Sequence, residues 1–395
     1  MSAGLASLLQ LDEETKKARG LLHTPGEIAR QPEIWPKTVR AMHAHANRLR
    51  ELLDGVHDVL LTGAGSSYFI GKSLERALAG HLKARVTAVP STEVVMDPEA
   101  TLPRSSFLLV SFARSGNSPE GNATFQLADR LRPGQVRHLV VTCNPEGTLA
   151  SLARATESPA VLCELPEAND QGLAMTNSFT SMFVAALALG YLDDLEAHAH
   201  VVEGLAQSGG EVLGRHDKAL EDLANRDFRR AFFIGSGASY GAALECHLKV
   251  QELTDGEVVG KAEETLGLRH GPMAAIAASS LVVLFASSSP YRRQYETDLL
   301  RELHAKALGL QRVVVCGRAE PEWRDLVHHV IEFDPVGRLS TADEVLPPVQ
   351  VIVGQLLGLF ASIRSGLAPD APSRHGVIHR VVEGVRIYSY GPIGP

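Results

Sequence analysis

One short stretch, SFARSGNSPE at residues 111–120, has the composition of a phosphate site. Ser118, followed by a proline, is typical of the start of a helix, where free backbone N–H groups and the helix dipole attract an anion. The same stretch holds Ser115, Asn117 and, as a forked cation suited to phosphate, Arg114. We therefore predict that this segment cradles a phosphate group.

A second turn rich in glycine and serine, GAGSS at residues 63–67, adds donors to the same site. Gly65, Ser66 and Ser67 are its candidate phosphate-binding residues. Such a turn alone is most often a plain strand-to-helix connection, and only the pair of turns favours phosphate. The turn does not fit a dinucleotide site, because Tyr68 stands where the third glycine belongs, nor a Walker P-loop, since no GKS or GKT closes it.

Groups able to move protons gather in another region of the chain. Glu245, Lys249 and Glu252 are spaced four and three residues apart, so in a helix they share one face. A solvated face with one ion pair is the plain alternative. The rest of this helix is apolar, however, which favours a charged stripe that meets a cleft. His270 stands before Gly-Pro and therefore at a turn, and we count it as a candidate acid–base group because of these neighbours.

The elements that must position these residues occur in two copies. Three anchors recur in the same order, at offsets of 172 or 173 residues. They are LLTGAGSSYFIG with FFIGSGASYGAA, LLVSFARSG with VVLFASSSP, and HLVVTCN with RVVVCG. Three ordered matches argue for a duplicated domain, and the period is too long for a solenoid. In the second copy, the segment that corresponds to the phosphate site is SSSP at residues 287–290. It lacks the arginine and the glycine of the first copy, so we expect one phosphate site per chain.

Each anchor is a short apolar run that precedes a helical segment, which is typical of buried parallel strands. We predict an α/β fold of two tandem, doubly wound parallel sheets of flavodoxin-like type, with ligands beyond the carboxyl ends of the strands. Thr24 is expected to cap a helix of the N-terminal segment. The expected parts are a helical segment over residues 1–50, a first domain with the phosphate site over 51–210, a second domain with the acid–base residues over 211–365, and an extended tail over 366–395.

Composition restricts the partners of the chain. It has 395 residues, a formal net charge of -8 and a pI of about 6.1. Nucleic-acid and membrane-surface partners both need a basic face, so neither is expected. Four widely spaced cysteines without a CxxC pair argue against a zinc site or a disulfide framework and fit a reducing cytoplasm. The sequence shows neither a signal peptide nor a long apolar span.

The motifs, in this order and spacing, resemble the double sugar-isomerase-domain (SIS) family, which includes the isomerase half of glucosamine-6-phosphate synthase. They are most similar to its galactosamine-6-phosphate deaminase/isomerase branch, also known as tagatose-6-phosphate ketose/aldose isomerase. The resemblance covers nearly the whole chain. It rests on the phrases GAGSS, SFARSGNSPE, TCNPEG, AMTNSFTSM, ALECHLKVQEL, LRHGP and RQYETDLLREL.

The resemblance implies a role for each matching residue. Glu252 would carry a proton between C1 and C2 of a sugar, with Lys249 and Glu245 orienting it. His270 would open the sugar ring from a partner subunit, which implies a homodimer with sites shared across its interface. The remaining positions would surround the substrate, with Ser66, Ser67, Arg114, Ser115 and Ser118 on the phosphate and Thr176 and Asn177 near the sugar.

The chain departs from the synthase at three points. Ala113 replaces a phosphate-binding serine, and Arg114 replaces a glutamine, which compensates with charge. The synthase also has a catalytic lysine in its tail, whereas no lysine follows Lys306 here. The sequence leaves open which residue takes its place among His375, His379 and Arg380.

The implied activity is conversion of galactosamine 6-phosphate to tagatose 6-phosphate and ammonia, with no metal or redox cofactor. Synthesis of an amino sugar would need a glutamine-hydrolysing domain with an N-terminal cysteine. This chain begins Met1-Ser2 and has its first cysteine at Cys143, so we expect deamination. Glucosamine 6-phosphate as the substrate, plain aldose–ketose isomerisation and a sugar-phosphate-sensing regulator without turnover are the alternatives. Glu252 and His270 favour an enzyme over a sensor.

Overall fold

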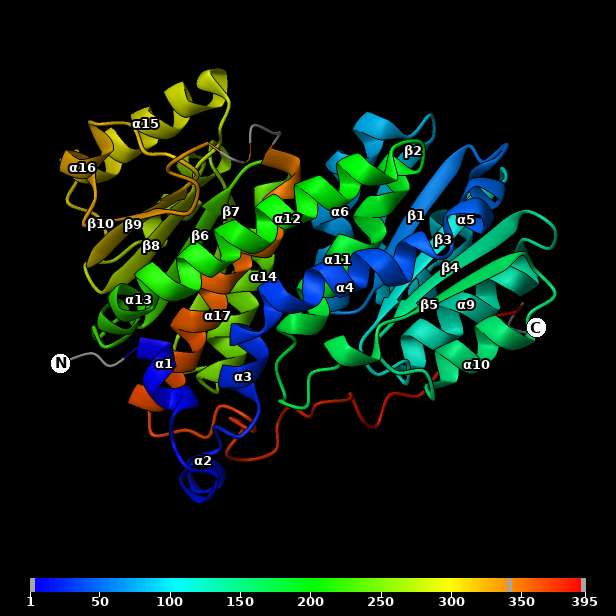
Figure 1. Ribbon diagram of the computed structural model, residues 1–395, viewed down its shortest axis with the longest axis horizontal. Helices are drawn as coiled ribbons and strands as arrows, with labels where there is room; N and C mark the ends of the chain where they lie inside the picture. Colours follow the sequence, from blue (N-terminus) through cyan, green and yellow to red (C-terminus); the bar gives the residue numbers. More distant parts are fainter. Residues whose placement is uncertain (1–3, 338, 340–342, 392–395) are drawn as a thin grey trace.

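Two five-stranded parallel sheets form the frame of the molecule (Figure 1). The structure is a computed structural model that describes residues 4–337, 339 and 343–391. The sheet orders are β2-β1-β3-β4-β5 and β10-β9-β8-β6-β7, so the two sheets have the same topology and the predicted pair of doubly wound domains is confirmed. The strands are β1 (Asp58–Gly63), β2 (Arg85–Pro90), β3 (Phe107–Ala113), β4 (Val136–Thr142), β5 (Ala160–Glu164), β6 (Arg230–Gly235), β7 (Val259–Glu264), β8 (Ser280–Phe285), β9 (Gln311–Cys316) and β10 (His329–Glu332).

The strands form where the sequence offers unbroken apolar runs. All residues of β1 and β8 are buried, and so are all but the last residue of β3. Parallel sheets are covered on both faces, so their strands need such runs rather than alternating polarity. The pairing is equivalent in the two sheets. Leu61 of β1 opposes Val110 of β3, and Phe233 of β6 opposes Val283 of β8.

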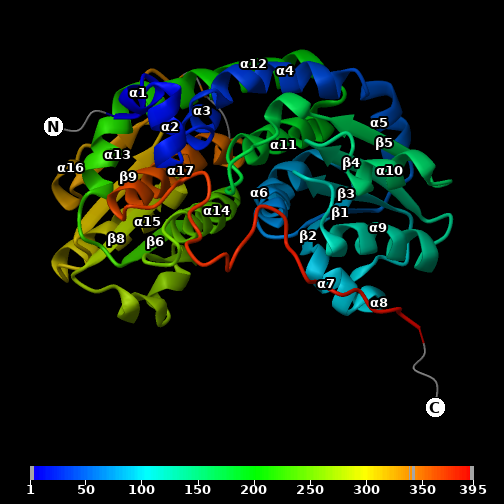
Figure 2. The same ribbon diagram turned by 90° about the horizontal axis from the view of Figure 1, so that it is seen from below.

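Helices cover both sheets and fill the space between them (Figures 1 and 2). None of the helices in the described part of the chain is both long and apolar enough to cross a membrane. The N-terminal helices are α1 (Gly4–Leu9), α2 (Glu13–Arg19), α3 (Thr24–Ala29), α4 (Gln31–His43) and α5 (Ala46–Leu53). Those beside the first sheet are α6 (Ser66–His81), α7 (Ser91–Met96), α8 (Pro98–Thr101), α9 (Pro119–Leu131) and α10 (Thr148–Ala155).

The remaining helices connect the two halves or cover the second sheet. They are α11 (Asn177–Leu187), α12 (Leu195–Glu211), α13 (Asp217–Ala224), α14 (Ala238–Leu253), α15 (Pro290–Ala305), α16 (Trp323–Leu326) and α17 (Pro347–Arg364). Short turns of 3-10 or π-helix lie at η1 (Pro166–Ala168), η2 (Ala188–Tyr191), η3 (Val212–His216), η4 (Gly267–Arg269), η5 (Pro272–Ala275) and η6 (Asp343–Val345).

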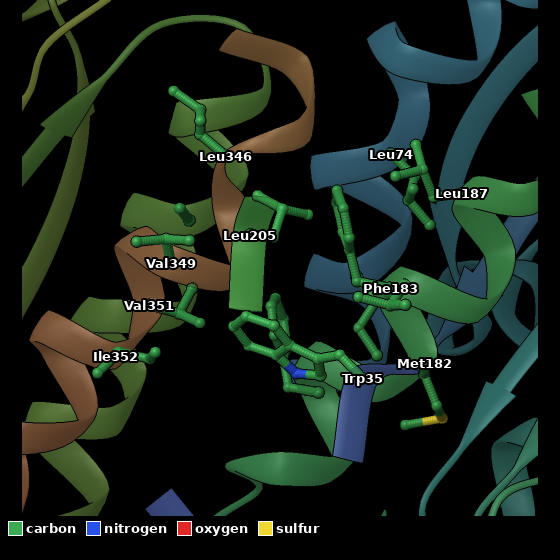
Figure 3. Packing of buried hydrophobic residues seen from close by; sticks show 14 of the residues in the cluster. Trp35, Leu74, Met182, Phe183, Leu187, Leu205, Leu346, Val349, Val351 and Ile352 are labelled. Atoms are coloured by element: carbon green, nitrogen blue, oxygen red, sulfur yellow. The ribbon is translucent and has the colours of Figure 1, made fainter. Parts of the chain in front are cut away.

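One hydrophobic core runs through both halves of the molecule. Figure 3 shows its central part, where Trp35 of α4 lies near Phe183 of α11 and Leu205 of α12, between α6 and α17. The indole N–H of Trp35 donates to Oγ1 of Thr180 at 2.9 Å, so this large side chain is buried with its polar atom satisfied. Because the two sheets share this core, any shift of one against the other would disturb close packing.

The chain ends in an extended tail that crosses the molecule (Figures 1 and 2, red). Residues 366–391 contain neither helix nor strand and pass from the second sheet's side to the first. Asp370 of the tail accepts hydrogen bonds from the backbone N–H groups of Leu22, His23 and Thr24 and from the Thr24 hydroxyl. His23 is the N-cap residue of α3, so the expectation that Thr24 caps this helix is wrong by one residue, and the tail provides the cap.

Buried His198 pairs with half-buried His43 beside the core. Nε2 of His198 lies 3.1 Å from the carbonyl oxygen of Val184, and its Nδ1 lies 2.8 Å from Nε2 of His43. The carbonyl can only accept, so Nε2 of His198 carries the proton and Nδ1 accepts from His43. Burial, together with the nearby His43, lowers the pKa of His198 to about 4. The folded protein therefore keeps this ring neutral.

We expect stability to fall as the pH drops from about 6.5 to about 4, because an unfolded histidine takes up a proton in this range and buried His198 does not. The contribution of neutral His198 to the free energy of unfolding is complete above the pKa of an unfolded histidine. It is lost progressively as the pH falls from that value toward the pKa of the folded state. Between about pH 7.5 and 5, the free energy of unfolding of the His198→Gln variant should fall by roughly 2 kcal/mol less than that of the original protein. Urea unfolding at the two pH values measures this. His200→Gln, at an exposed position of α12, is the control, and equal pH dependence in both variants would contradict the assignment.

Candidate active site

A pocket of about 350 Å³ opens at the carboxyl ends of β1 and β3. These strands are neighbours, and the strand order reverses between them, which is where doubly wound sheets bind their ligands. Most of the lining comes from the turn after β1, the loop after β3, helix α14 and the tail. The pocket therefore draws on both halves of the molecule.

The turn after β1 brings small residues to the pocket wall. A side chain at Gly63 would collide with Ser67, so the turn can be this tight only with glycine there. Gly65 has a φ of 54°, which other residues rarely adopt, and directly precedes the start of α6. Gly65, Ser66 and Ser67 all line the pocket, so two hydroxyl groups stand at this wall.

The loop after β3 forms the adjacent wall. Ser118 is the N-cap residue of α9, whose first residue is a proline, as the sequence predicts. Ser115, Gly116 and Ser118 line the pocket, and the positive end of the α9 dipole faces the same region. Asn117 does not line it. Its Oδ1 instead accepts the backbone N–H of Thr148 at 3.0 Å, which joins this loop to the start of α10.

Arg114 lies within the pocket wall and is only 7% exposed. Its Nη1 donates to the carbonyl oxygen of Leu173 at 2.7 Å, and its Nη2 donates to the carbonyl oxygen of Arg380. Its Nε has no hydrogen-bond partner among the described residues. The guanidinium group of Arg114, which is predicted to bind a phosphate, therefore also holds the tail against the phosphate-binding loop after β3. We call this loop and the turn after β1 the phosphate cradle.

Three charged residues of α14 meet at the opposite wall. Nζ of Lys249 lies 2.6 Å from Oε2 of Glu252 and 3.4 Å from Oε1 of Glu245. The same Nζ lies 3.0 Å from the hydroxyl of Ser66, across the boundary between the two halves. Lys249 and Glu245 are fully buried, whereas the side chain of Glu252 is 23% exposed and lines the pocket with Lys249. The alternative of a solvated face is thus excluded.

The electrostatics of this group favour one ammonium shared by two carboxyl groups. Burial alone would lower the pKa of Lys249, but Glu245 and Glu252 outweigh it and raise that pKa above its usual value. Burial raises the pKa of Glu245 to about 7. Lys249 therefore keeps its charge at neutral pH. Glu252 is the carboxyl group of the pair that reaches the pocket and can exchange a proton with a ligand.

Besides Asn117, three residues expected at the site lie outside the pocket lining. Thr176 and Asn177 are fully buried and do not line the pocket, because they start α11 and bond to a buried carboxylate. Their backbone N–H groups lie 2.8 and 3.1 Å from the carboxylate oxygens of Asp170. The preceding residue, Met175, lines the pocket instead. His270 is exposed and lies outside the pocket of its own chain.

The tail forms one wall of the pocket, as the resemblance to the synthase with its tail lysine implied. Residues 378–382 line the pocket. The Arg380 side chain turns away from it, because Nε donates to the carbonyl oxygen of Asp170 at 3.0 Å and Nη2 donates to Oδ1 of Asn169 at 2.9 Å. His379 lines the pocket and His375 does not. The glycine and proline content of the tail predicts an extended chain, but no local pattern predicts where it lies.

The equivalent loop of the second half is occupied by the protein's own carboxylates. The backbone N–H of Ser287 donates to Glu296 at 3.0 Å, and that of Ser288 donates to Asp343 at 2.5 Å. Arg292 pairs with Asp343 at 2.9 Å. An anion from solution would have to displace these carboxylates, whereas the loop after β3 is open to the pocket.

The pocket combines two chemical capacities. Hydroxyl groups, a helix N-terminus and Arg114 suit an anionic group such as a phosphate. Glu252, held beside Lys249, suits transfer of a proton to or from a carbon next to a carbonyl or imine. No group of three His, Cys, Asp or Glu side chains in the described ranges is placed to hold a metal ion.

Comparison with known proteins agrees with this geometry. The SIS domain family matches residues 52–191 and 225–338. A Streptomyces coelicolor protein is 40% identical over 93% of this chain and 96% of its own length. D-galactosamine-6-phosphate deaminase AgaS of Escherichia coli O157:H7 is 34% identical over 93% of this chain and 96% of its own. The solved structure of tagatose-6-phosphate ketose/aldose isomerase from Escherichia coli superposes with a TM-score of 0.84 at 31% identity, covering 93% of this chain and 96% of that one.

We expect Arg114→Met to loosen the tail, because the change removes the donors that hold the Leu173 and Arg380 carbonyl oxygens. Hydrogen bonds from a charged group contribute about 1.5–3 kcal/mol, so trypsin should cleave after Arg380 roughly 10-fold faster or more. Time-resolved mass spectrometry of the digest measures this.

Arg137→Met is the matched control. Arg137 also donates to several backbone carbonyl oxygens, those of Glu51, Leu52 and Asp54, but far from the tail. If both variants and the original protein lose the tail at the same rate, Arg114 does not fasten it.

Proposed function

The chain belongs to the SIS domain family, and we propose that it is an enzyme that converts galactosamine 6-phosphate and water into tagatose 6-phosphate and ammonia. One observation carries this proposal: the Lys249–Glu252 pair and the hydroxyl-lined cradle face the same pocket. Relatives named for deamination of D-galactosamine 6-phosphate and for isomerisation of tagatose 6-phosphate support the substrate class. Both names describe reactions that change the groups on C1 and C2 of a phosphorylated sugar.

The cradle binds the phosphate and thereby orients the sugar. Ser66, Ser67, Ser115 and Ser118 provide hydroxyl groups from two neighbouring loops, and the α9 dipole adds its positive end. Arg114 adds a full positive charge from within the wall. With the phosphate fixed there, the other end of an open-chain sugar points toward α14, where the proton-transfer group stands.

Glu252 is the group that moves the proton. In the open-chain aldehyde it removes the proton from C2 while the aldehyde oxygen takes up a proton, which gives a cis-enolamine. It then returns the proton to C1 while the nitrogen loses one, which gives an imine at C2. Water then adds to this imine, the bond between C2 and nitrogen breaks, and ammonia leaves with the ketose phosphate. Lys249, 2.6 Å away, pairs with Glu252 and stabilises negative charge as it develops on the substrate. No electron acceptor is needed, since the products carry the same oxidation level as the substrate and water.

His270 acts in this scheme from a second copy of the chain. It is exposed and lies outside the pocket of its own chain, so only another copy can present it to a bound sugar ring. We therefore propose a homodimer with two shared sites as the assembly that this role of His270 requires. The four cysteines Cys143, Cys163, Cys246 and Cys316 are buried and unpaired, which supports a cytoplasmic location.

We expect ammonia release from galactosamine 6-phosphate, and a loss of about 10²–10⁴-fold in kcat for Glu252→Gln, because the amide cannot take up the C2 proton. Binding of the sugar phosphate should persist in this variant, since the cradle is unchanged. Coupled ammonia assays with galactosamine 6-phosphate and glucosamine 6-phosphate, and calorimetry for binding, measure the two properties.

Glu196→Gln, at an exposed position of α12, is the control and should match the original protein. Ammonia from glucosamine 6-phosphate alone would change the substrate. Binding without ammonia or ketose formation from either sugar would establish a sensor. Turnover retained in Glu252→Gln would remove Glu252 from the role of base.

A mixing experiment tests the shared site. Homodimers of Glu252→Gln and of His270→Asn should each be inactive. After unfolding and refolding together in equal amounts, about half of the dimers are mixed, and each has one intact site, so roughly a quarter of the activity should return. Ammonia release before and after mixing is the measurement. If His270 served its own chain, both sites of the mixed dimer would be defective and mixing would restore nothing.

A further inference from the structure

Helices α6 and α14 follow the two equivalent glycine turns and pack against each other at the centre of the molecule (Figure 2). The two helices are in direct contact at Gly241 of α14 and Ser73 of α6. A Cβ atom at Gly241 would lie 2.6 Å from both the backbone nitrogen and the Cα of Ser73, and nearer still to its hydroxyl. Real Cβ atoms do not approach other atoms this closely, so the crossing requires glycine at position 241.

The duplication makes this glycine informative. The repeat offset of 172 residues pairs Gly241 with Phe69 in the first copy. One copy therefore carries a large aromatic residue and the other has no side chain at the same point of the helix. The backbone of α14 can approach α6 here only because the second copy lacks the side chain that the first copy has.

The same two helices meet again at the active site. Nζ of Lys249 on α14 lies 3.0 Å from the hydroxyl of Ser66 at the start of α6. At about 1.5 Å per residue, this second contact is roughly 10–12 Å from the Gly241–Ser73 contact along both helices. The rings of Phe69 and His247 lie between the two contacts, with centroids 6.0 Å apart. The helices therefore run in opposite directions and are held together at two separated points.

We propose that Gly241 is a positioning residue: by allowing the backbones of α6 and α14 to touch at Ser73, it sets the place of Lys249 and Glu252 above the phosphate cradle. This inference rests on the proposed function, because it assigns Glu252 as the base. The cradle belongs to the first half of the molecule and the base to the second. Their separation is therefore fixed by this helix pair and not by either sheet alone.

The consequence of a side chain at position 241 follows from the geometry. The obstacle includes backbone atoms of Ser73, which cannot rotate away, so α14 must move away from α6. Lys249 and Glu252 move with α14, while the hydroxyl groups of Ser115 and Ser118 stay in place. A displacement of about 1 Å at a reacting group can cost 10²-fold in rate, whereas binding of the phosphate itself depends on the cradle.

The test is Gly241→Ala, compared with Gly80→Ala. Gly80 lies on α6. A Cβ atom there would meet no other described part of the chain within 4 Å, apart from the backbone of its own helix, so this control adds the same methyl group without an obstacle. Gly241→Ala should lower kcat for ammonia release about 10- to 100-fold and change the dissociation constant of inorganic phosphate by less than about threefold. Gly80→Ala should match the original protein in both.

Two changes at Ser73 probe the contact from the other helix. Ser73→Ala removes only the hydroxyl, which bonds to the carbonyl oxygen of Phe69, and should retain activity. Ser73→Thr keeps that hydroxyl and enlarges the buried side chain that contacts Gly241, so it should reproduce the loss of kcat in a milder form. This variant decides the matter if Gly241→Ala does not fold, as judged by circular dichroism and thermal unfolding.

A further comparison separates backbone from side-chain contact. The double variant Gly241→Ala with Ser73→Gly should remain as impaired as Gly241→Ala, because backbone atoms of residue 73 still block the methyl group. Full activity in Gly241→Ala or in Ser73→Thr, while Glu252→Gln is inactive, would overturn the positioning role and leave the proposed function intact. Absence of ammonia release from the original protein would overturn the proposed function, and the positioning role with it.

Discussion

A fully buried ammonium group is the constraint on which the arrangement of this protein depends. Lys249 has no access to solvent, and a charge in that position is tolerated only when it is paired and hydrogen-bonded. Glu245 and Glu252 provide the opposite charge from the same helix, and Ser66 provides an acceptor from the other half of the chain. The ammonium group has all three of these partners only when α6 and α14 are in place, so the arrangement of the two halves and the candidate active site depend on each other.

The two copies of the duplicated fold contribute different parts of the pocket. Both copies keep the same strand order and the same turn before a central helix. In the first copy the loop after β3 stays open and forms the cradle. In the second copy, Glu296 and Asp343 fill the equivalent loop, while its helix α14 contributes Lys249 and Glu252. The two copies thus supply complementary halves of a single pocket, which neither could form alone.

Much of this could be predicted from local sequence patterns, and the remainder depends on distant contacts. Apolar runs predicted the strands, and the Ser118-Pro pair predicted the start of α9, because both signals lie within a few residues. The spacing of Glu245, Lys249 and Glu252 predicted their shared face. No such signal marks the residues that meet through folding, such as the tail segment 378–382 or the carbonyl groups that Arg114 binds. The resemblance placed Thr176 and Asn177 near the sugar, whereas their place is fixed by Asp170, which binds the start of α11.

The position of the tail also has a consequence for biosynthesis. Residues 378–382, which close one side of the pocket, are translated after the strands of both sheets. Domains fold as units in the order of synthesis, so the first sheet and its cradle can form while the tail is still to be made. A nascent chain can therefore hold a complete phosphate cradle in a pocket that still lacks a wall. The pocket gains this wall only when the tail has been made and has docked, so folding of the two sheets alone leaves the pocket open on one side.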